Sequence, residues 1–94
     1  MKHYVIVKWN EKVLDKNEYY KKACEAFADV VKIDGVLGLN VYKNCNDKPN
    51  RFDVMIEIEC TNEGLENYDV SQLHQDWKAN FTQYMETKTI FDHD

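Results

Sequence analysis

The chain has 94 residues, of which 44% are hydrophobic and 31% charged, with only three glycines and one proline. This composition is typical of a single globular domain, residues 1–94, and excludes collagen-like and disordered chains. The net charge of −5 disfavours nucleic acid as a partner, and no apolar run is long enough to span a membrane. Because no secretory signal is visible and the three cysteines are widely spaced, we expect a cytoplasmic protein with reduced thiols.

The chain opens with the pattern of a strand followed by a helix. Residues 3–9 alternate with period two, and the face that we assign to the core carries His3, Val5, Val7 and Trp9. Asp15 and Glu18 then resemble a capping box, which predicts a helix start. Apolar residues recur at helical spacing as far as Val31, and Gly35 suits the turn that ends the segment.

Two further strands are predicted next, at residues 37–43 and 52–59. The polar segment 44–50 contains the only proline and reads as the connection between them. In the later strand, large apolar residues alternate with mostly polar ones, so one face is core.

The last part of the chain predicts two helices and a strand. A short helix opens near Thr61, the chain bends at residues 69–71, and a longer helix runs to about Met85 before a strand at 88–92. The order β-α-β-β-α-β predicts an α+β, ferredoxin-like fold, with a four-stranded antiparallel sheet and both helices on one face.

The sheet face without helices needs a cover. Its expected side chains are partly apolar, namely Tyr4, Ile6, Tyr42 and Met55, and an uncovered apolar face is a docking surface. Two such faces packed together give a homodimer. A solvated face with scattered apolar residues is the alternative.

Five segments resemble the stress-responsive dimeric α/β-barrel (Dabb) domain family. Residues 2–9 resemble its opening strand, and residues 33–36 its Ile-Pro-Gly-Ile/Val segment. Residues 52–54 resemble the Tyr/His-Asp-Leu/Val start of its third strand. Residues 68–74 resemble its Tyr-x-x-His-Pro-x-His stretch, and residues 90–92 its terminal strand. The resemblance implies a dimeric α+β barrel with a cavity between sheet and helices.

The resemblance also implies a set of site residues. Some family members resemble polyketide cyclases that need no cofactor, and in those a first-strand histidine, a tyrosine and a later histidine line the pocket. His3, Tyr68 and His74 stand at these positions. The chain departs from the family pattern in two places. Asp34 replaces the family's proline, and Ser71-Gln72 replaces its His-Pro pair.

These three side chains fit the chemistry of an aldol-type cyclisation. Such a reaction needs a base beside a carbonyl and a donor for the enolate oxygen. His74 would be the base, Tyr68 its partner, and His3 a further polar contact. In the structural alternative, His3 closes the strand end and His74 hydrogen-bonds a backbone carbonyl or Tyr68.

Other residues are assigned to the cavity wall or set aside. The expected apolar lining is Val5, Val7, Tyr20, Phe27, Trp77 and Phe81. Residues 92–94 offer two carboxylates and an imidazole, but successive strand residues face opposite ways, so we expect a frayed terminus and no metal site. We expect no cofactor.

Three functions remain open at this point. The first is a homodimeric domain with a small apolar cavity that binds a small apolar or carbonyl-bearing molecule. The second is a cofactor-independent enzyme, cyclase-like or monooxygenase-like, with His74 as its base. The third is an accessory domain that serves a larger assembly by docking through its sheet face.

Overall fold

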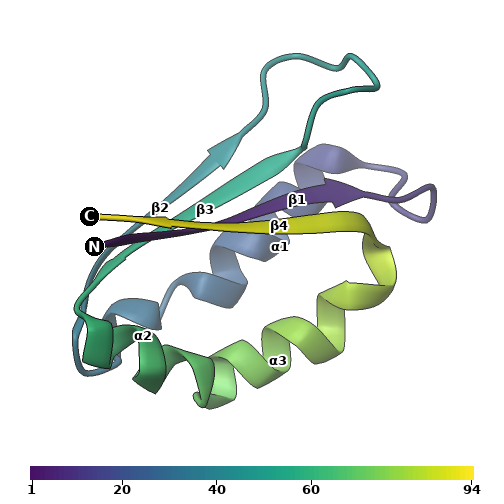
Figure 1. Cartoon of the computed structure of the whole chain (residues 1–94). Coiled ribbons are helices and arrows are strands. Elements are labelled where there is room, and N and C mark those ends of the chain that lie inside the picture. Colours follow the sequence, from purple (N-terminus) through teal and green to yellow (C-terminus); the bar gives the residue numbers. More distant parts are fainter.

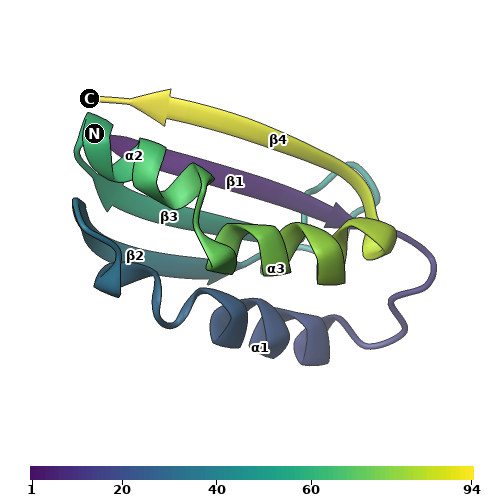
Figure 2. The ribbon, with the colours of Figure 1, turned by 90° about the horizontal axis from the view of Figure 1, so that it is seen from below.

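The computed structural model describes all 94 residues as a four-stranded antiparallel sheet with its helices on one side (Figures 1 and 2). The strands are β1 (Lys2–Trp9), β2 (Val36–Lys43), β3 (Val54–Cys60) and β4 (Met85–His93). The helices are α1 (Lys16–Phe27), α2 (Asn62–Asp69) and α3 (Gln72–Phe81), with the short 3-10 turns η1 (Val30–Lys32) and η2 (Thr82–Tyr84). The strand order β2-β3-β1-β4 places one strand inside each β-helix-β unit. The predicted ferredoxin-like α+β fold is confirmed.

The alternation in β1 gives the sheet its two different faces. Val5, Val7 and Trp9 are buried, whereas Tyr4 and Ile6 between them are half-buried. Because successive strand residues point to opposite faces, the first set joins the core under the helices and the second set faces away from it.

Each α-helix begins at a side-chain cap. Asp15 caps α1 by accepting from the backbone N–H of Glu18, as the sequence predicts, and Thr61 and Ser71 cap α2 and α3. A cap satisfies a backbone donor that the first turn leaves free and stabilises the helix by about 0.5–2 kcal/mol. None of the helices combines the length and the apolar character needed to cross a bilayer.

Aromatic rings fill the space between the sheet and the helices. The ring of Trp77 lies 4.8 Å from that of Phe27 on α1 and 4.4 Å from that of Phe81, centroid to centroid. Trp9 reaches Phe81 from β1 at 6.1 Å. Burying one such side chain contributes roughly 1.5–3 kcal/mol.

Three predicted boundaries and the predicted frayed terminus are wrong. Helix α1 ends at Phe27, because the chain turns there so that η1 packs against β2, which leaves Val31 48% exposed. Helix α3 stops at Phe81 and β4 begins at Met85 instead of residue 88, because Met85 already pairs with β1. The terminus is not frayed, since His93 pairs with Lys2. In each case tertiary pairing overrides the local pattern.

Two glycines bring α2 into backbone contact with the turn before β2. Gly35 has a φ of +85°, where a side chain is strained. A Cβ atom on Gly64 would lie 2.2 Å from the Gly35 carbonyl oxygen, so this position also excludes a side chain. The close approach fixes α2 against the sheet, and Tyr68 lies one turn further along the same face of that helix.

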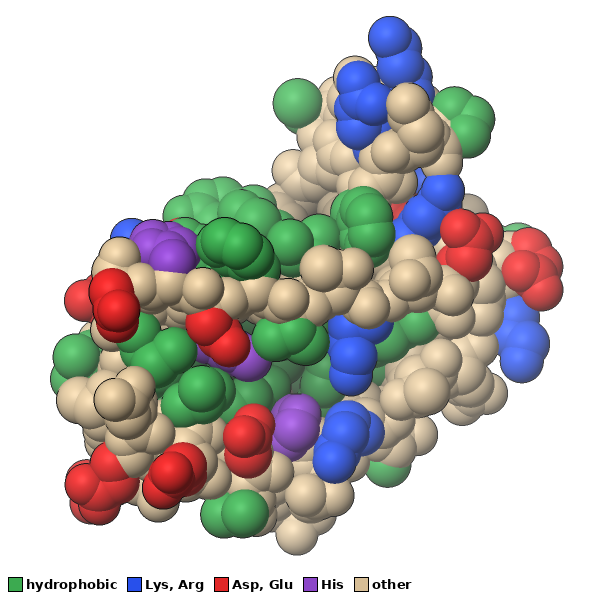
Figure 3. Space-filling view, in the orientation of Figure 1, with side chains coloured by type: hydrophobic (Ala, Val, Ile, Leu, Met, Phe, Trp, Pro, Cys, Tyr) green, Lys and Arg blue, Asp and Glu red, His purple; other side chains and the backbone are tan.

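The uncovered face of the sheet is partly apolar, as predicted. The registers of the strands align Ile6 with Met55 and Met55 with Tyr42, and Tyr4 lies two residues before Ile6. The connection between β2 and β3, residues 44–53, stands out beyond this face at one end of the sheet (Figures 1 and 3).

Replacing Gly64 with alanine tests the backbone contact. Alanine ordinarily stabilises a helix by about 1 kcal/mol relative to glycine. Here we expect Gly64→Ala to lower the free energy of unfolding by about 1–3 kcal/mol, because the new methyl group meets backbone. Urea denaturation measures this, with Gly38→Ala as control, because its Cβ atom would meet nothing closer than 3.7 Å. A Gly64→Ala protein as stable as the parent would contradict the contact.

Candidate functional site

A cavity of about 330 Å³ opens between the β1–β4 side of the sheet and the α2–α3 segment. Figure 3 shows the surface hollowed there, with histidine, lysine and acidic side chains around the hollow. Eleven residues line it: His3, Val5, Leu65, Tyr68, Asp69, His74, Trp77, Lys78, Lys88, Ile90 and Asp92. The structure therefore brings together the three residues that the resemblance singles out.

His3 enters this cavity from β1. It lies on the same face as Val5 and is only 6% exposed. Asp92 lies directly opposite on β4, and Nδ1 of His3 donates a hydrogen bond to its Oδ1 at 2.5 Å. Because the carboxylate can only accept, the proton of a neutral imidazole sits on Nδ1 and the lone pair on Nε2.

Tyr68 lies at the back of the cavity, near the end of α2. Its side chain is 1% exposed, and its ring lies 5.8 Å from that of His3 and 4.6 Å from that of His74. The hydroxyl is buried and has no hydrogen-bond partner in the protein. Burial, and to a lesser extent the charge of Asp69, raises the pKa of Tyr68 well above its usual range, so the group stays a protonated donor.

His74 reaches the cavity from the first turn of α3. Ser71 caps that helix by accepting from the backbone N–H of His74, and its own hydroxyl donates to the carbonyl of Tyr68. Nδ1 of His74 donates to the carbonyl of Asp69 at 2.9 Å, which leaves a lone pair on Nε2 of the neutral ring. The N-cap of α3 is thus Ser71, at the position where the resembling family pattern has a histidine.

The remaining lining residues divide into an apolar wall and a charged rim. The apolar wall consists of Val5, Leu65, Trp77 and Ile90. The charged rim consists of Asp69, Lys78 on α3, and Lys88 and Asp92 on β4. Together with the buried Tyr68, the site offers two imidazole rings, an apolar wall and charged groups of both signs. No group of three or more His, Cys, Asp or Glu side chains is arranged to hold a metal ion.

The six residues predicted to line the cavity have different surroundings. Val5 and Trp77 line it. Val7 and Phe27 are wholly buried in the core, and Tyr20 packs against the core edge, where its hydroxyl donates to the carbonyl of Val41. The helical and strand periods identify the inward face of an element but not where the layers separate.

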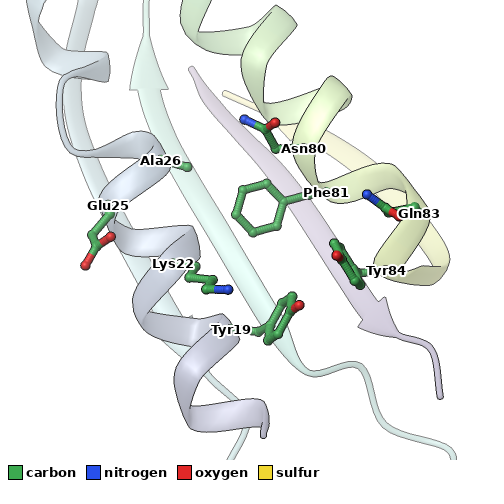
Figure 4. A pocket seen from close by; sticks show the side chains of 8 residues that line it. All are labelled: Tyr19, Lys22, Glu25, Ala26, Asn80, Phe81, Gln83 and Tyr84. Carbon is green, nitrogen blue, oxygen red and sulfur yellow. The ribbon is translucent and has the colours of Figure 1, made fainter. Parts of the chain in front are cut away.

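Phe81 lies at a second hollow, a groove of about 560 Å³ between α1 and the α3–η2 segment. Figure 4 shows Tyr19 and Tyr84 facing one another across it, with Phe81 reaching from α3 toward α1. The ammonium group of Lys22 lies 4.7 Å from the centre of the Tyr19 ring. All polar groups that line this groove have access to water or to partners, so it lacks the unpaired buried donor of the first cavity.

Sequence reasoning misses several residues of the site. Asp92 is the last residue of the predicted strand 88–92 and the first of the predicted frayed terminus, and neither prediction gives its pairing with His3. Lys78 and Lys88 carry no signal of their own, since lysines at such positions usually face solvent.

The comparisons with known proteins agree on the fold. The family model described as "Stress responsive A/B Barrel Domain" matches residues 1–94. A search of curated proteins finds no match to this chain. Among solved structures, a dimeric protein of unknown function with a ferredoxin-like fold from Bacteroides fragilis has a TM-score of 0.82 at 20% identity, covering 99% of this chain and 93% of that chain.

Two other solved structures share the fold at low sequence identity. A Dabb family protein from Mesorhizobium loti has a TM-score of 0.74 at 11% identity, covering 99% of this chain and 93% of that chain. The hydroxynitrile lyase from Passiflora edulis has a TM-score of 0.75 at 11% identity, covering 98% of this chain and 89% of that chain. At these identities the likeness shows the fold alone.

The ferredoxin-like sheet and the family match therefore agree over the full length described. The chain belongs to the stress responsive A/B barrel domain family, Dabb.

Proposed function

We propose that residues 1–94 form one small-molecule-binding domain that works as a homodimer. The ligand occupies the cavity lined by His3, Tyr68 and His74. The observation that carries this proposal is the buried hydroxyl of Tyr68, which has no partner in the protein. A donor kept from both water and acceptors costs about 1–3 kcal/mol. Tyr68 lines the cavity but its hydroxyl is closed to water, so a ligand oxygen that recovers this free energy must displace neighbouring lining side chains to reach it.

The lining favours a small carbonyl compound with an apolar body. Tyr68 would donate to the carbonyl oxygen, and the apolar body would lie against Val5 and Trp77. Nε2 of His3 and Nε2 of His74 would accept from a hydroxyl or enol group of the same ligand. The volume of about 330 Å³ lies at the lower end of the range for ligand pockets, which favours a compact molecule.

We assign the two histidines to ligand contact and not to a reaction. The hydrogen bond from His74 to a backbone carbonyl holds its ring in place, and Asp92 does the same for His3. These are the contacts of a preorganised binding site, which lowers the entropy lost when a ligand binds.

The homodimer would form through the uncovered sheet face. Tyr42 is exposed there, and Tyr4, Ile6 and Met55 are half-buried in the single chain. The Bacteroides fragilis protein with the same fold is described as dimeric. Packing two copies of this face together would remove its apolar side chains from water.

Removing the Tyr68 hydroxyl should stabilise the free protein. We expect Tyr68→Phe to raise the free energy of unfolding by about 1 kcal/mol, because it deletes an unpaired buried donor and keeps the ring. The matched control is Tyr20→Phe, which loses the hydrogen bond to Val41 and should be destabilised by about 1 kcal/mol. Urea denaturation at one protein concentration measures both. A loss of stability in Tyr68→Phe equal to that in Tyr20→Phe would mean that the Tyr68 hydroxyl has a partner in the free protein.

The same substitution should weaken ligand binding. Acetophenone and 2,4-pentanedione serve as carbonyl probes, and the NMR shifts of the His3 and His74 rings report occupancy. We expect Tyr68→Phe to lower affinity by roughly 5- to 100-fold, the equivalent of one hydrogen bond to a buried donor. Tyr84→Phe, outside the cavity, is the control and should bind as the parent does. If no probe shifts either histidine, or if Tyr68→Phe binds equally well, the proposed site is wrong.

The homodimer has its own test. Light scattering at tens of micromolar should report about twice the chain mass of 11.2 kDa. Ile6→Lys should shift the protein to monomer, because it buries two unpaired charges in each dimer. Val70→Lys changes an exposed apolar residue away from this face and should leave the mass unchanged. A parent mass near that of one chain would refute the homodimer.

A further inference from the structure

The cavity beneath the β4 edge carries opposite charges at its two ends. On β4, Lys88, Ile90 and Asp92 stand at every second position, so all three point to the helix side of the sheet and line the cavity. Four residues separate Lys88 from Asp92, which places their Cα atoms about 13 Å apart along the strand. The strand therefore supplies a cation at one end of the cavity and a carboxylate at the other.

The helical side of the cavity has its charges in the matching order. Figure 2 shows α3 and β4 running in opposite directions, because η2 turns the chain back between them. Asp69 and His74 therefore lie toward the Asp92 end of the cavity. Lys78 follows His74 by one turn on the same face of α3, so it lies toward the Lys88 end. In Figure 3 the hollow has acidic side chains on one side, basic side chains on the other and histidine between them.

The acidic end has partners within the protein, whereas the basic end has none. The Asp92 carboxylate accepts a hydrogen bond from His3, and the Asp69 carbonyl accepts one from His74. Neither Lys78 nor Lys88 forms an ion pair, although five other lysines of the chain do. Two ammonium groups at one end of a cavity are stabilised by an anion placed between them.

We propose that the ligand of this cavity is a keto acid, a compact carbonyl compound that carries a carboxylate at the far end of its apolar body. The carbonyl lies at the end with the two histidines, and the carboxylate lies between Lys78 and Lys88. A carboxylate has two oxygens, so it can accept from both ammonium groups at once. The reverse orientation is disfavoured, because it would place the carboxylate beside Asp69 and Asp92. This inference rests on the proposed function and adds the chemical class of the ligand.

The charge of the whole chain makes this preference a property of the cavity alone. The net charge of −5 repels anions at long range, so an anionic ligand gains nothing from the general field of the protein. Both lysines are exposed, and water therefore weakens each ion pair. Two exposed ion pairs together correspond to roughly 3- to 30-fold in affinity.

A pair of probes of equal size tests the contribution of the charge. 4-Acetylbenzoate is acetophenone with a carboxylate across the ring from the carbonyl group, and 4-acetylbenzamide is its neutral analogue. NMR titration followed at the rings of His3 and His74 gives the Kd of each probe. We expect the benzoate to bind about 3- to 30-fold more tightly than the benzamide, with the ratio falling toward one in about 1 M NaCl.

Lysine variants assign that preference to the cavity. Glutamine keeps most of the lysine stem and removes the charge, so Lys78→Gln and Lys88→Gln should each lower the affinity for the benzoate by about 2- to 5-fold. The double variant should bind both probes equally, with the affinity for the benzamide unchanged. Lys21→Gln removes an exposed cation of α1 that does not line the cavity, and it should keep the full preference.

The outcomes separate this inference from the proposed function. If neither probe shifts either histidine, both are wrong. If the benzamide binds but the benzoate binds no more tightly, the keto acid assignment alone is wrong. A preference for the benzoate that persists in the double variant would also overturn it, because the carboxylate would then be held by other groups.

Discussion

Side chains of β1 point alternately to the two faces of the sheet, and the rest of the structure depends on this alternation. The strand pairs with β3 on one side and with β4 on the other, so its register sets that of the sheet. One set of side chains, beginning with His3 and Val5, faces the helices and builds both core and cavity. The other set, with Tyr4 and Ile6, faces the uncovered side. A slip of one residue would exchange the two sets, which is why burial of one face specifies the register so strongly.

The cavity exists because the helical layer is interrupted. Helix α2 is held to the sheet by the Gly35–Gly64 contact, and α3 starts again after Ser71 in a new direction. Tyr68 lies at this break, with its ring buried and its hydroxyl unpaired. An unpaired buried donor lowers stability, and the chain has two, Trp9 Nε1 and the Tyr68 hydroxyl. Trp9 belongs to the packed core, whereas Tyr68 lines a cavity, which is why we propose a ligand for Tyr68 alone. The hydrogen bonds of His3 and His74 also support a ligand, because each bond holds Nδ1 of its ring and leaves Nε2 available for a further contact.

Much of the fold follows from the sequence, and the reasons for the failures are physical. Alternation in β1 correctly assigns His3 to the inner face, and the caps at Asp15 and near Thr61 mark true helix starts. The end of α1 was placed too late because the helical period continues to Val31, although the chain must turn to reach β2. Local patterns carry no information on that constraint.

The site was only partly accessible from the sequence. The resemblance to a family supplied His3, Tyr68 and His74, and the strand face of His3 with the spacing of Tyr68 and His74 favoured a common cavity, which all three line. The hydrogen bond of Asp92 to His3 could not be predicted from local patterns, because it depends on the register between strands at the two ends of the chain. Periodicity also could not show that Val7 and Phe27 are buried in the core instead of lining the cavity. The helices pack directly on the centre of the sheet, and the cavity opens beneath its β4 edge.

The most direct measurement of the central claim is the carbonyl stretch of a bound probe. Isotope-edited infrared difference spectra of carbonyl-labelled acetophenone report whether its oxygen accepts a hydrogen bond. A ligand held by the Tyr68 hydroxyl should absorb at lower frequency in the parent protein than in Tyr68→Phe at equal occupancy. The same frequency in both proteins would mean that this hydroxyl does not meet the ligand, and the account of the cavity would be wrong.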